Sequence, residues 1–320
     1  MLRMDGFSYH HASDPERAVA LYRELASPMY IAGGTDLLPN LKHRILRPEN
    51  LIGIGQALPR GWETVDGVIH LGAGTRLSQV ATMTEVPPLA QAAGLVAGPQ
   101  IRNMGTIGGN VLLDTRCLYF NQTEFWRKSL GWCLKADGDW CHVIEGPKTC
   151  VAAQSSDTVP VLLAMDASIR LLGPEGSREM RLRDLYRFDG VNHLKIEPGE
   201  LLTHILLPEP SPGFRGVYLK LRRRDSIDFP QLGLATIAMF SGEILESLEM
   251  VVGAVNPQPK PIRKLDTFLG QPLDDAAIDA IAELVVKQTR PQTSVVGDSA
   301  WRRTMAGHFA RAALRELARA

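Results

Sequence analysis

The sequence has no excess charge of either sign and no long apolar run. Lysine and arginine total 35, and aspartate and glutamate also total 35. Nucleic-acid-binding domains usually carry a basic excess, so that class is disfavoured. No apolar stretch approaches the roughly 18 residues of a membrane-spanning helix, and the amino-terminal residues lack the apolar run of a signal peptide. These absences predict a soluble cytoplasmic protein with neither a membrane nor a nucleic-acid partner.

Motifs of hydrolytic and common nucleotide-binding enzymes are also missing. The eight histidines are scattered, and there is no Ser-His-Asp, paired-carboxylate or H-E-x-x-H arrangement. Neither a Walker A sequence nor a Rossmann G-x-G-x-x-G turn is present. Hydrolytic chemistry therefore has no support, and a nucleotide would have to bind through a less common fold.

Length and composition indicate an ordinary globular chain. Apolar residues make up 45% and charged residues 22% of the 320 positions, so a sizeable core is available. The length predicts two to three domains or one large domain. Turns rich in glycine and proline divide the chain into expected units at residues 1–55, 56–210 and 211–320.

The apolar pattern predicts mixed α and β structure. The first unit is a small β-α-β motif, in which Ser13 caps a helix with Pro15 near its start. The third unit has strands followed by two helices. Strands are expected at residues 5–9, 30–31, 51–54, 68–72, 168–172, 217–221, 234–240 and 248–255, and helices at 88–98 and 160–165. The two terminal helices carry apolar residues at helical spacing, namely Ile278, Ile281 and Val285 in one and Trp301, Met305, Phe309 and Ala312 in the other.

Two glycine-rich turns lie about seventy residues apart, in the first and second units. They are Ala32-Gly33-Gly34-Thr35 and Thr106-Ile107-Gly108-Gly109-Asn110. Glycine lets a backbone approach a ligand closely, and successive N–H groups form an anion-binding nest. Two such turns from different lobes would clamp a pyrophosphate from both sides, although each alone is also typical of an ordinary tight turn.

All four cysteines fall in one irregular stretch, which we interpret as an inserted loop at residues 114–155. They are Cys117, Cys133, Cys141 and Cys150. Long irregular loops are usually functional. Four thiolates suit an iron–sulfur cluster, whereas structural zinc sites favour C-x2-C pairs, which are absent, and disulfides conflict with a reducing cytoplasm. The spacing alone leaves a cluster, a zinc site and unrelated cysteines open, with His142 as a replacement ligand or a bystander.

Other residues near these features admit two interpretations. Asp157 stands at the start of a helix, as an ordinary cap does. Lys220 and the run 222–224 end a strand, either as a solvated edge or as cations for a phosphate or an electron-rich ring. The insert also contains Trp126, Trp132 and Trp140, which either shield a cluster from water or form the loop's own small core.

The two glycine turns, in order, spacing and location, resemble the FAD-binding motifs of the flavin subunits in the xanthine oxidase family of molybdenum enzymes. The first motif continues through Asp36-Leu37-Leu38. The resemblance covers essentially the whole chain. It implies an α+β protein with a two-lobed FAD-binding domain of the vanillyl-alcohol-oxidase (PCMH) type. A C-terminal domain of the CO dehydrogenase flavoprotein type would follow.

The insert restricts the resemblance to one branch of this family. Most flavin subunits of the family pass directly from the second turn to the helix near Asp157. Segments 114–122, 133–135 and 141–144 are similar to the β subunits of 4-hydroxybenzoyl-CoA reductases, a branch of the family whose inserted loop holds a [4Fe–4S] cluster. The resemblance implies that Cys117, Cys133, Cys141 and Cys150 ligate such a cluster.

The resemblance also implies FAD contacts, residue by residue. The first turn would line the pyrophosphate and flavin, the second would supply the other clamp, and Lys220 would lie close to the isoalloxazine ring. The implied FAD-binding residues are Tyr30, Ile31, Ala32, Gly33, Gly34, Thr35, Asp36, Leu37, Val96, Thr106, Ile107, Gly108, Gly109, Asn110, Asp157 and Lys220.

The implied function is electron transfer, with no catalytic residue in this chain. The resemblance implies that electrons pass from reduced ferredoxin through the [4Fe–4S] cluster and FAD to partner subunits with [2Fe–2S] centres and molybdopterin. There, 4-hydroxybenzoyl-CoA would be reduced to benzoyl-CoA in anaerobic aromatic degradation. A heterohexamer with a large molybdenum subunit and a small [2Fe–2S] subunit is implied. The alternative is the flavin subunit of an aldehyde or purine dehydrogenase, with electrons flowing from substrate to an acceptor.

Overall fold

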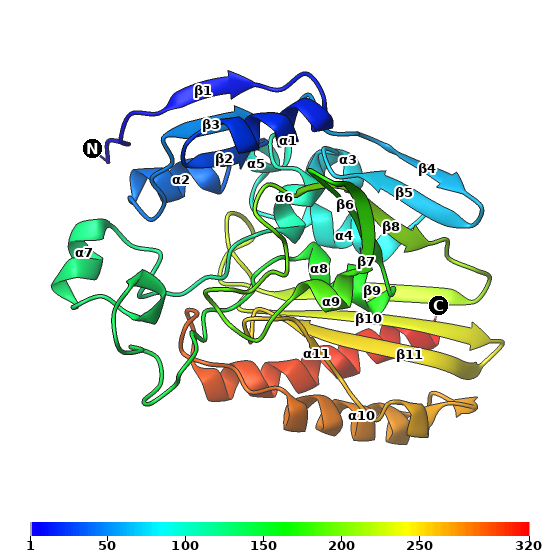
Figure 1. Cartoon of the computed structure of the whole chain (residues 1–320). Coiled ribbons are helices and arrows are strands. Elements are labelled where there is room, and N and C mark those ends of the chain that lie inside the picture. The colour runs from blue at the N-terminus through cyan, green and yellow to red at the C-terminus, as the bar shows by residue number, and fades with distance from the viewer. Residues whose placement is uncertain (1, 320) are drawn as a thin grey trace.

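The computed structural model describes residues 2–319, which form three β-sheets with helices between and around them (Figure 1). The first sheet is parallel, with strand order β1-β3-β2. Its strands are β1 (Ser8–His11), β2 (Pro28–Ile31) and β3 (Asn50–Gly53), and helix α1 (Pro15–Glu24) connects β1 to β2. The expected β-α-β unit is confirmed, although β1 begins three residues later than expected.

The cap of helix α1 differs from the expected one. The Asp14 carboxylate, not Ser13, accepts the backbone N–H of Arg17, at 2.7 Å. Ser13 instead donates its hydroxyl to the Asp14 carboxylate at 2.6 Å. A carboxylate has two acceptor oxygens and favours the positive end of a helix, so Asp14 takes both hydrogen bonds.

The second sheet is antiparallel, with strand order β4-β5-β8-β6-β7. Its strands are β4 (Trp62–Val65), β5 (Val68–Gly72), β6 (Ser168–Gly173), β7 (Gly176–Arg181) and β8 (Leu201–Pro208). Six helices accompany it: α3 (Leu77–Val80), α4 (Pro87–Gly94), α5 (Pro99–Arg102), α6 (Ile107–Val111), α8 (Thr158–Ala164) and α9 (Leu182–Leu185). The chain leaves this sheet after β5 and returns at β6, so the segment between them carries both the second turn and the insert.

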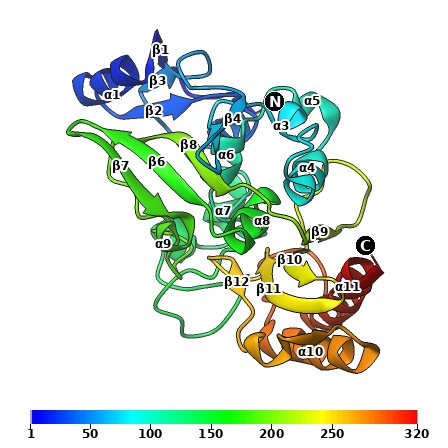
Figure 2. The same ribbon diagram turned by 90° about the vertical axis from the view of Figure 1, so that its right-hand side faces the viewer.

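The third sheet has strand order β12-β11-β10-β9, with β13 paired to β11. Its strands are β9 (Phe214–Leu221), β10 (Leu232–Ser241), β11 (Ile244–Gly253), β12 (Lys260–Pro261) and β13 (Gln271–Pro272). Helices α10 (Asp275–Gln288) and α11 (Ser299–Arg319) cover one face, and α8 packs on the other (Figure 2). The expected order of strands followed by two helices is confirmed.

The buried face of α11 agrees only in part with the expected one. Met305 and Phe309 pack, partly buried, against the core, whereas Trp301 is 46% exposed and Ala312 is also exposed. The buried face instead contains Ala306, Ala310, Ala313, Leu314 and Leu317, together with the fully buried Arg302. The Arg302 guanidinium donates to the backbone carbonyls of Gln231 at 2.7 Å and Ala254 at 2.8 Å. These bonds fix the rotation of the helix, because a buried guanidinium must have its donors satisfied.

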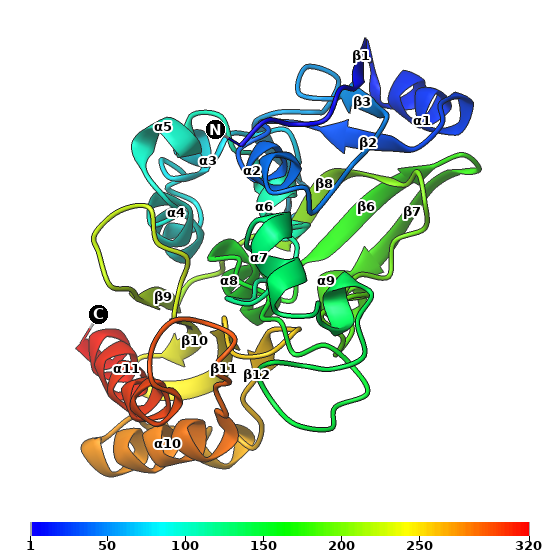
Figure 3. The same ribbon diagram turned by 90° about the vertical axis from the view of Figure 1, so that its left-hand side faces the viewer.

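The insert projects from one side of the molecule, between the first sheet and α11 (Figures 1 and 3). It contains one short helix, α7 (Glu124–Ser129), and a 3₁₀ turn at Leu134–Ala136. Arg127 on α7 is buried and donates to the backbone carbonyls of His43 and Arg44 at 3.1 and 3.0 Å. The insert is therefore tied to the first lobe, just past the end of helix α2 (Leu37–Lys42). Within residues 2–319, no helix is both long and apolar enough to cross a membrane.

Candidate functional site

The glycine-rich turns meet at one cavity of about 470 Å³ between the first and second lobes. Most of the FAD-binding residues expected from the sequence lie in its wall. These are Tyr30 to Leu37, Val96, Thr106, Gly108 to Asn110, and Asp157. Two of the expected FAD-binding residues, Ile107 and Lys220, do not line this cavity. The structure therefore brings together turns that are far apart in sequence.

The first turn follows β2 and leads into α2. Gly34 has φ +69, a left-handed conformation that glycine adopts without steric cost. A Cβ atom on Gly33 would collide with the backbone carbonyl of Met104, which precedes the second turn. Gly33 is thus required where the two turns touch.

The second turn forms the start of α6. Thr106 caps this helix by accepting the backbone N–H of Gly109 at 3.1 Å. The Asn110 side-chain oxygen accepts the hydroxyls of Ser156 and Thr158 at 2.6 and 2.7 Å. Ile107 is fully buried behind the cavity wall. The turn is thereby anchored to the segment that leaves the insert.

Asp157 is held by two side chains of β9 rather than acting as a helix cap. Its carboxylate accepts the Tyr218 hydroxyl at 2.8 Å and the Lys220 ammonium at 2.9 Å, and it makes no cap hydrogen bond. Lys220 also donates to the carbonyl of Leu95, next to the cavity-lining Val96. Burial raises the pKa of Asp157, while Lys220 and Tyr218 oppose this rise. Lys220 therefore lies behind the cavity wall, with Asp157 in front of it.

Arg116 is a cavity residue that the sequence did not single out. It forms an ion pair with Asp36 of the first turn, and its guanidinium lies 4.3 Å from the ring centroid of Phe229. Burial lowers the pKa of Arg116 to about 10. The sequence signal that could have indicated its role is its position directly before Cys117. This position places a cation at the junction of the two expected cofactor sites.

A second cavity of about 630 Å³ adjoins the first. The two cavities share Arg116, Ser155 and Phe229, and Cys117 lies in the wall of the second. Of the run at residues 222–224, Arg222 and Arg224 form ion pairs with Asp225 and Asp228. Arg223 and Arg224 line the second cavity, so the run does reach it. The adjoining cavity thus connects the glycine turns to the beginning of the insert.

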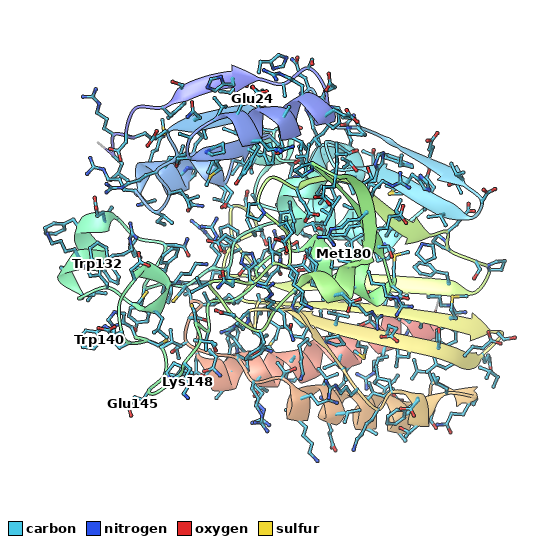
Figure 4. The ribbon with its side chains drawn as sticks, in the orientation of Figure 1. Glu24, Trp132, Trp140, Glu145, Lys148 and Met180 are labelled. Atoms are coloured by element: carbon cyan, nitrogen blue, oxygen red, sulfur yellow. The ribbon has the colours of Figure 1, made fainter. Side chains whose placement is uncertain are left out.

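The four cysteines line one small cavity inside the insert. They are Cys117, Cys133, Cys141 and Cys150, and all are free thiols. His142 is in the wall of this cavity, whereas the three tryptophans of the insert are not. Trp140 is 57% exposed and lies on the outer side of the insert (Figure 4). Tyr119 and Phe120 line the cavity instead. Shielding by the tryptophans is therefore not what the structure shows.

The four cysteines of this cavity do not form a ready site for a metal ion. Within residues 2–319, no three Cys, His, Asp or Glu side chains are grouped closely enough to hold one metal ion. Four soft thiols nevertheless face a common space, and the backbone N–H groups of Val143 and Ala152 lie 3.4 Å from the sulfurs of Cys141 and Cys150. Burial raises the pKa of the Cys117 thiol to about 11. Thiols, N–H···S contacts and burial are features that hold and tune iron–sulfur clusters.

The fold and the glycine-lined cavity define a two-lobed FAD-binding flavoprotein with an additional C-terminal domain. Residues 5–210 match the family described as "FAD binding domain in molybdopterin dehydrogenase", and residues 217–317 match "CO dehydrogenase flavoprotein C-terminal domain". The chain therefore belongs to the family of FAD-binding subunits of molybdenum hydroxylases. The expected α+β fold class is confirmed.

Individual relatives agree with this assignment. The chain is 31% identical to the aldehyde oxidoreductase FAD-binding subunit PaoB of Escherichia coli, over 84% of this chain and 87% of that protein. It is 30% identical to the carbon monoxide dehydrogenase medium chain of Afipia carboxidovorans, over 96% and 95% of the two chains. A solved structure of CO dehydrogenase from Oligotropha carboxidovorans superposes with a TM-score of 0.81 at 27% identity, covering 99% of both chains.

Proposed function

We propose that this chain is the FAD- and [4Fe–4S]-containing electron-transfer subunit of a 4-hydroxybenzoyl-CoA reductase. In this role it passes electrons from reduced ferredoxin to a small [2Fe–2S] subunit and a large molybdopterin subunit, within a heterohexamer. The substrate takes up two electrons and two protons at the partner's molybdenum site and yields benzoyl-CoA and water. The observation that carries the proposal is a single insert whose four cysteines line one cavity next to the FAD cavity.

The residues of this chain bind and orient the cofactors. The two turns would hold the pyrophosphate of FAD between the lobes, and the Lys220–Asp157 pair fixes the wall beside Val96. Arg116 joins the first turn to the beginning of the insert. When bound, a flavin exchanges one or two electrons and a cluster exchanges one, which suits a junction between a one-electron donor and a two-electron reaction.

The cluster is tested on the whole complex, purified without oxygen. We expect about four irons per copy of this chain beyond those of the [2Fe–2S] centres. Cys133→Ala should remove these irons and leave FAD content unchanged. Trp140→Phe, an exposed change in the same insert, is the matched control and should keep both cofactors. Wild-type complex with FAD but without the additional iron would refute the cluster.

The second candidate is the flavin subunit of an aldehyde or purine dehydrogenase. The similarity to PaoB, an aldehyde oxidoreductase subunit by name, favours it. Electrons would then flow from substrate through FAD to an acceptor. Assays with 4-hydroxybenzoyl-CoA and a low-potential donor, and in parallel with aldehydes or purines and an artificial acceptor, separate the two. Turnover of an aldehyde or purine without dehydroxylation would reject the reductase.

A further inference from the structure

Lys135 is a lysine buried within the insert, directly after the 3₁₀ turn begins. Only 6% of its side chain is exposed. Its Nζ atom lies 2.6 Å from Asp114 Oδ1 and 2.5 Å from the Thr115 hydroxyl. The carbonyls of Thr115 and Gly190 are 3.1 and 2.9 Å away. A buried ammonium with this many acceptors is held in one position, because breaking any of these hydrogen bonds would leave a buried charge less well compensated.

The Lys135–Asp114 pair crosses the wall between the two expected cofactor sites. Lys135 lines the cavity of the four cysteines, and Asp114 lines the FAD cavity. Gly190, a third partner, donates its backbone N–H to the carbonyl of Cys150 at 2.8 Å. The ammonium therefore connects the middle of the insert to its beginning and, through Gly190, to its end.

Taking the proposed cluster as given, we infer that Lys135 is a positioning residue that fixes the loop between Cys133 and Cys141 and favours electron acceptance at the cysteine cavity. Adding an electron to a thiolate-bound cluster adds negative charge. A fixed positive charge at the wall of a buried cavity stabilises that added charge more strongly than one in water. The Asp114 carboxylate holds the ammonium in place and offsets part of its effect.

The central experiment is an anaerobic redox titration of the complex, with the cluster followed by EPR. Lys135→Met should lower the equilibrium constant for one-electron reduction at least tenfold, which is a shift of about 59 mV to more negative potential. The matched control is Lys128→Met, because Lys128 is exposed on α7 in the same insert. It should shift the potential by less than a third of that amount.

Asp114→Asn provides a test of opposite sign. Removing the carboxylate leaves the ammonium uncompensated, so the potential should become more positive. The double variant should lie between the two single variants. A purely structural role for Lys135 predicts loss of iron without opposed shifts. Equal potentials in wild type and Lys135→Met, or shifts of the same sign in both single variants, would overturn the inference.

Two further measurements test the inference even if a variant fails to bind the cluster. If Lys135→Met binds no iron, Lys135→Arg, which keeps the charge, must restore iron binding, and the shift in Asp114→Asn still decides the sign. Limited proteolysis reports on the loop without any cofactor. Lys135→Met should be cleaved within residues 134–149 at least tenfold faster than Lys128→Met. If wild-type complex contains no cluster, the proposed function fails, whereas the proteolysis result still decides whether Lys135 holds the loop.

Discussion

The contact between the two glycine turns gives a sharp prediction for Gly33→Ala. The new Cβ would overlap the backbone carbonyl of Met104, so one of the turns must move. Backbone atoms cannot rotate away as a flexible side chain does, and overpacking of this kind costs about 1–3 kcal/mol. FAD binding needs both turns in place, so this strain is subtracted from the binding free energy. At about 1.4 kcal/mol per tenfold, FAD should bind about fivefold to about 140-fold more weakly.

The measurement is a fluorescence titration of FAD into flavin-free complex. Gly55→Ala is the matched control, because its Cβ would lie 3.5 Å from the carbonyl of Ala32 in the same turn, an ordinary contact. This variant should bind FAD within about twofold of wild type. If Gly33→Ala binds FAD as tightly as Gly55→Ala, the two turns do not form the binding site as described.

Three other changes test the site and its surroundings. Lys220→Met leaves the buried Asp157 carboxylate unpaired and should cost about 3–5 kcal/mol in denaturant unfolding, whereas Lys220→Met with Asp157→Asn should cost clearly less. Burial lowers the pKa of His193 from its ordinary 6.5, so below pH 6.5 the unfolded chain binds more protons and stability falls. His193→Phe should flatten this decline in thermal melts, and an unchanged slope would contradict it. Arg116→Met leaves Asp36 without its partner and should cost about 1–3 kcal/mol in thermal stability, with weaker FAD binding in the same titration.

The features that sequence predicted well are those set by local backbone chemistry. Residues 68–72 alternate towards a buried face, and β5 has those bounds. The glycine turns were recognisable because glycine adopts the left-handed φ seen at Gly34 without steric cost and leaves room for the close approach at Gly33. That the two turns would clamp one ligand was predicted from their glycine content, and the family resemblance favoured it, but the contact between residues 33 and 104 could not be predicted because nothing in the local sequence brings them together.

The features that sequence missed depend on partners distant in the chain. Asp157 has the position of a cap, yet its carboxylate is bound by Tyr218 and Lys220 on β9. The rotation of α11 follows from hydrogen bonds of Arg302 to carbonyls in other segments. In both cases a buried charge needs specific acceptors or donors, and this requirement overrides the helical pattern. An analysis of apolar periodicity considers only apolar residues and therefore does not predict where a buried charge will find its partners.

Both ends of the insert lie in the wall of the FAD cavity. It begins at Asp114 and ends at Ser155, and both residues line the FAD cavity. The turn before it is bonded to the segment after it through Asn110 and Ser156. A movement at either end of the insert therefore moves the FAD cavity wall. Reciprocity of binding equilibria then sets a limit: any strengthening of FAD binding by an ordered insert equals the stabilisation of the insert by bound FAD, and the unchanged FAD content expected of Cys133→Ala requires this coupling to be small.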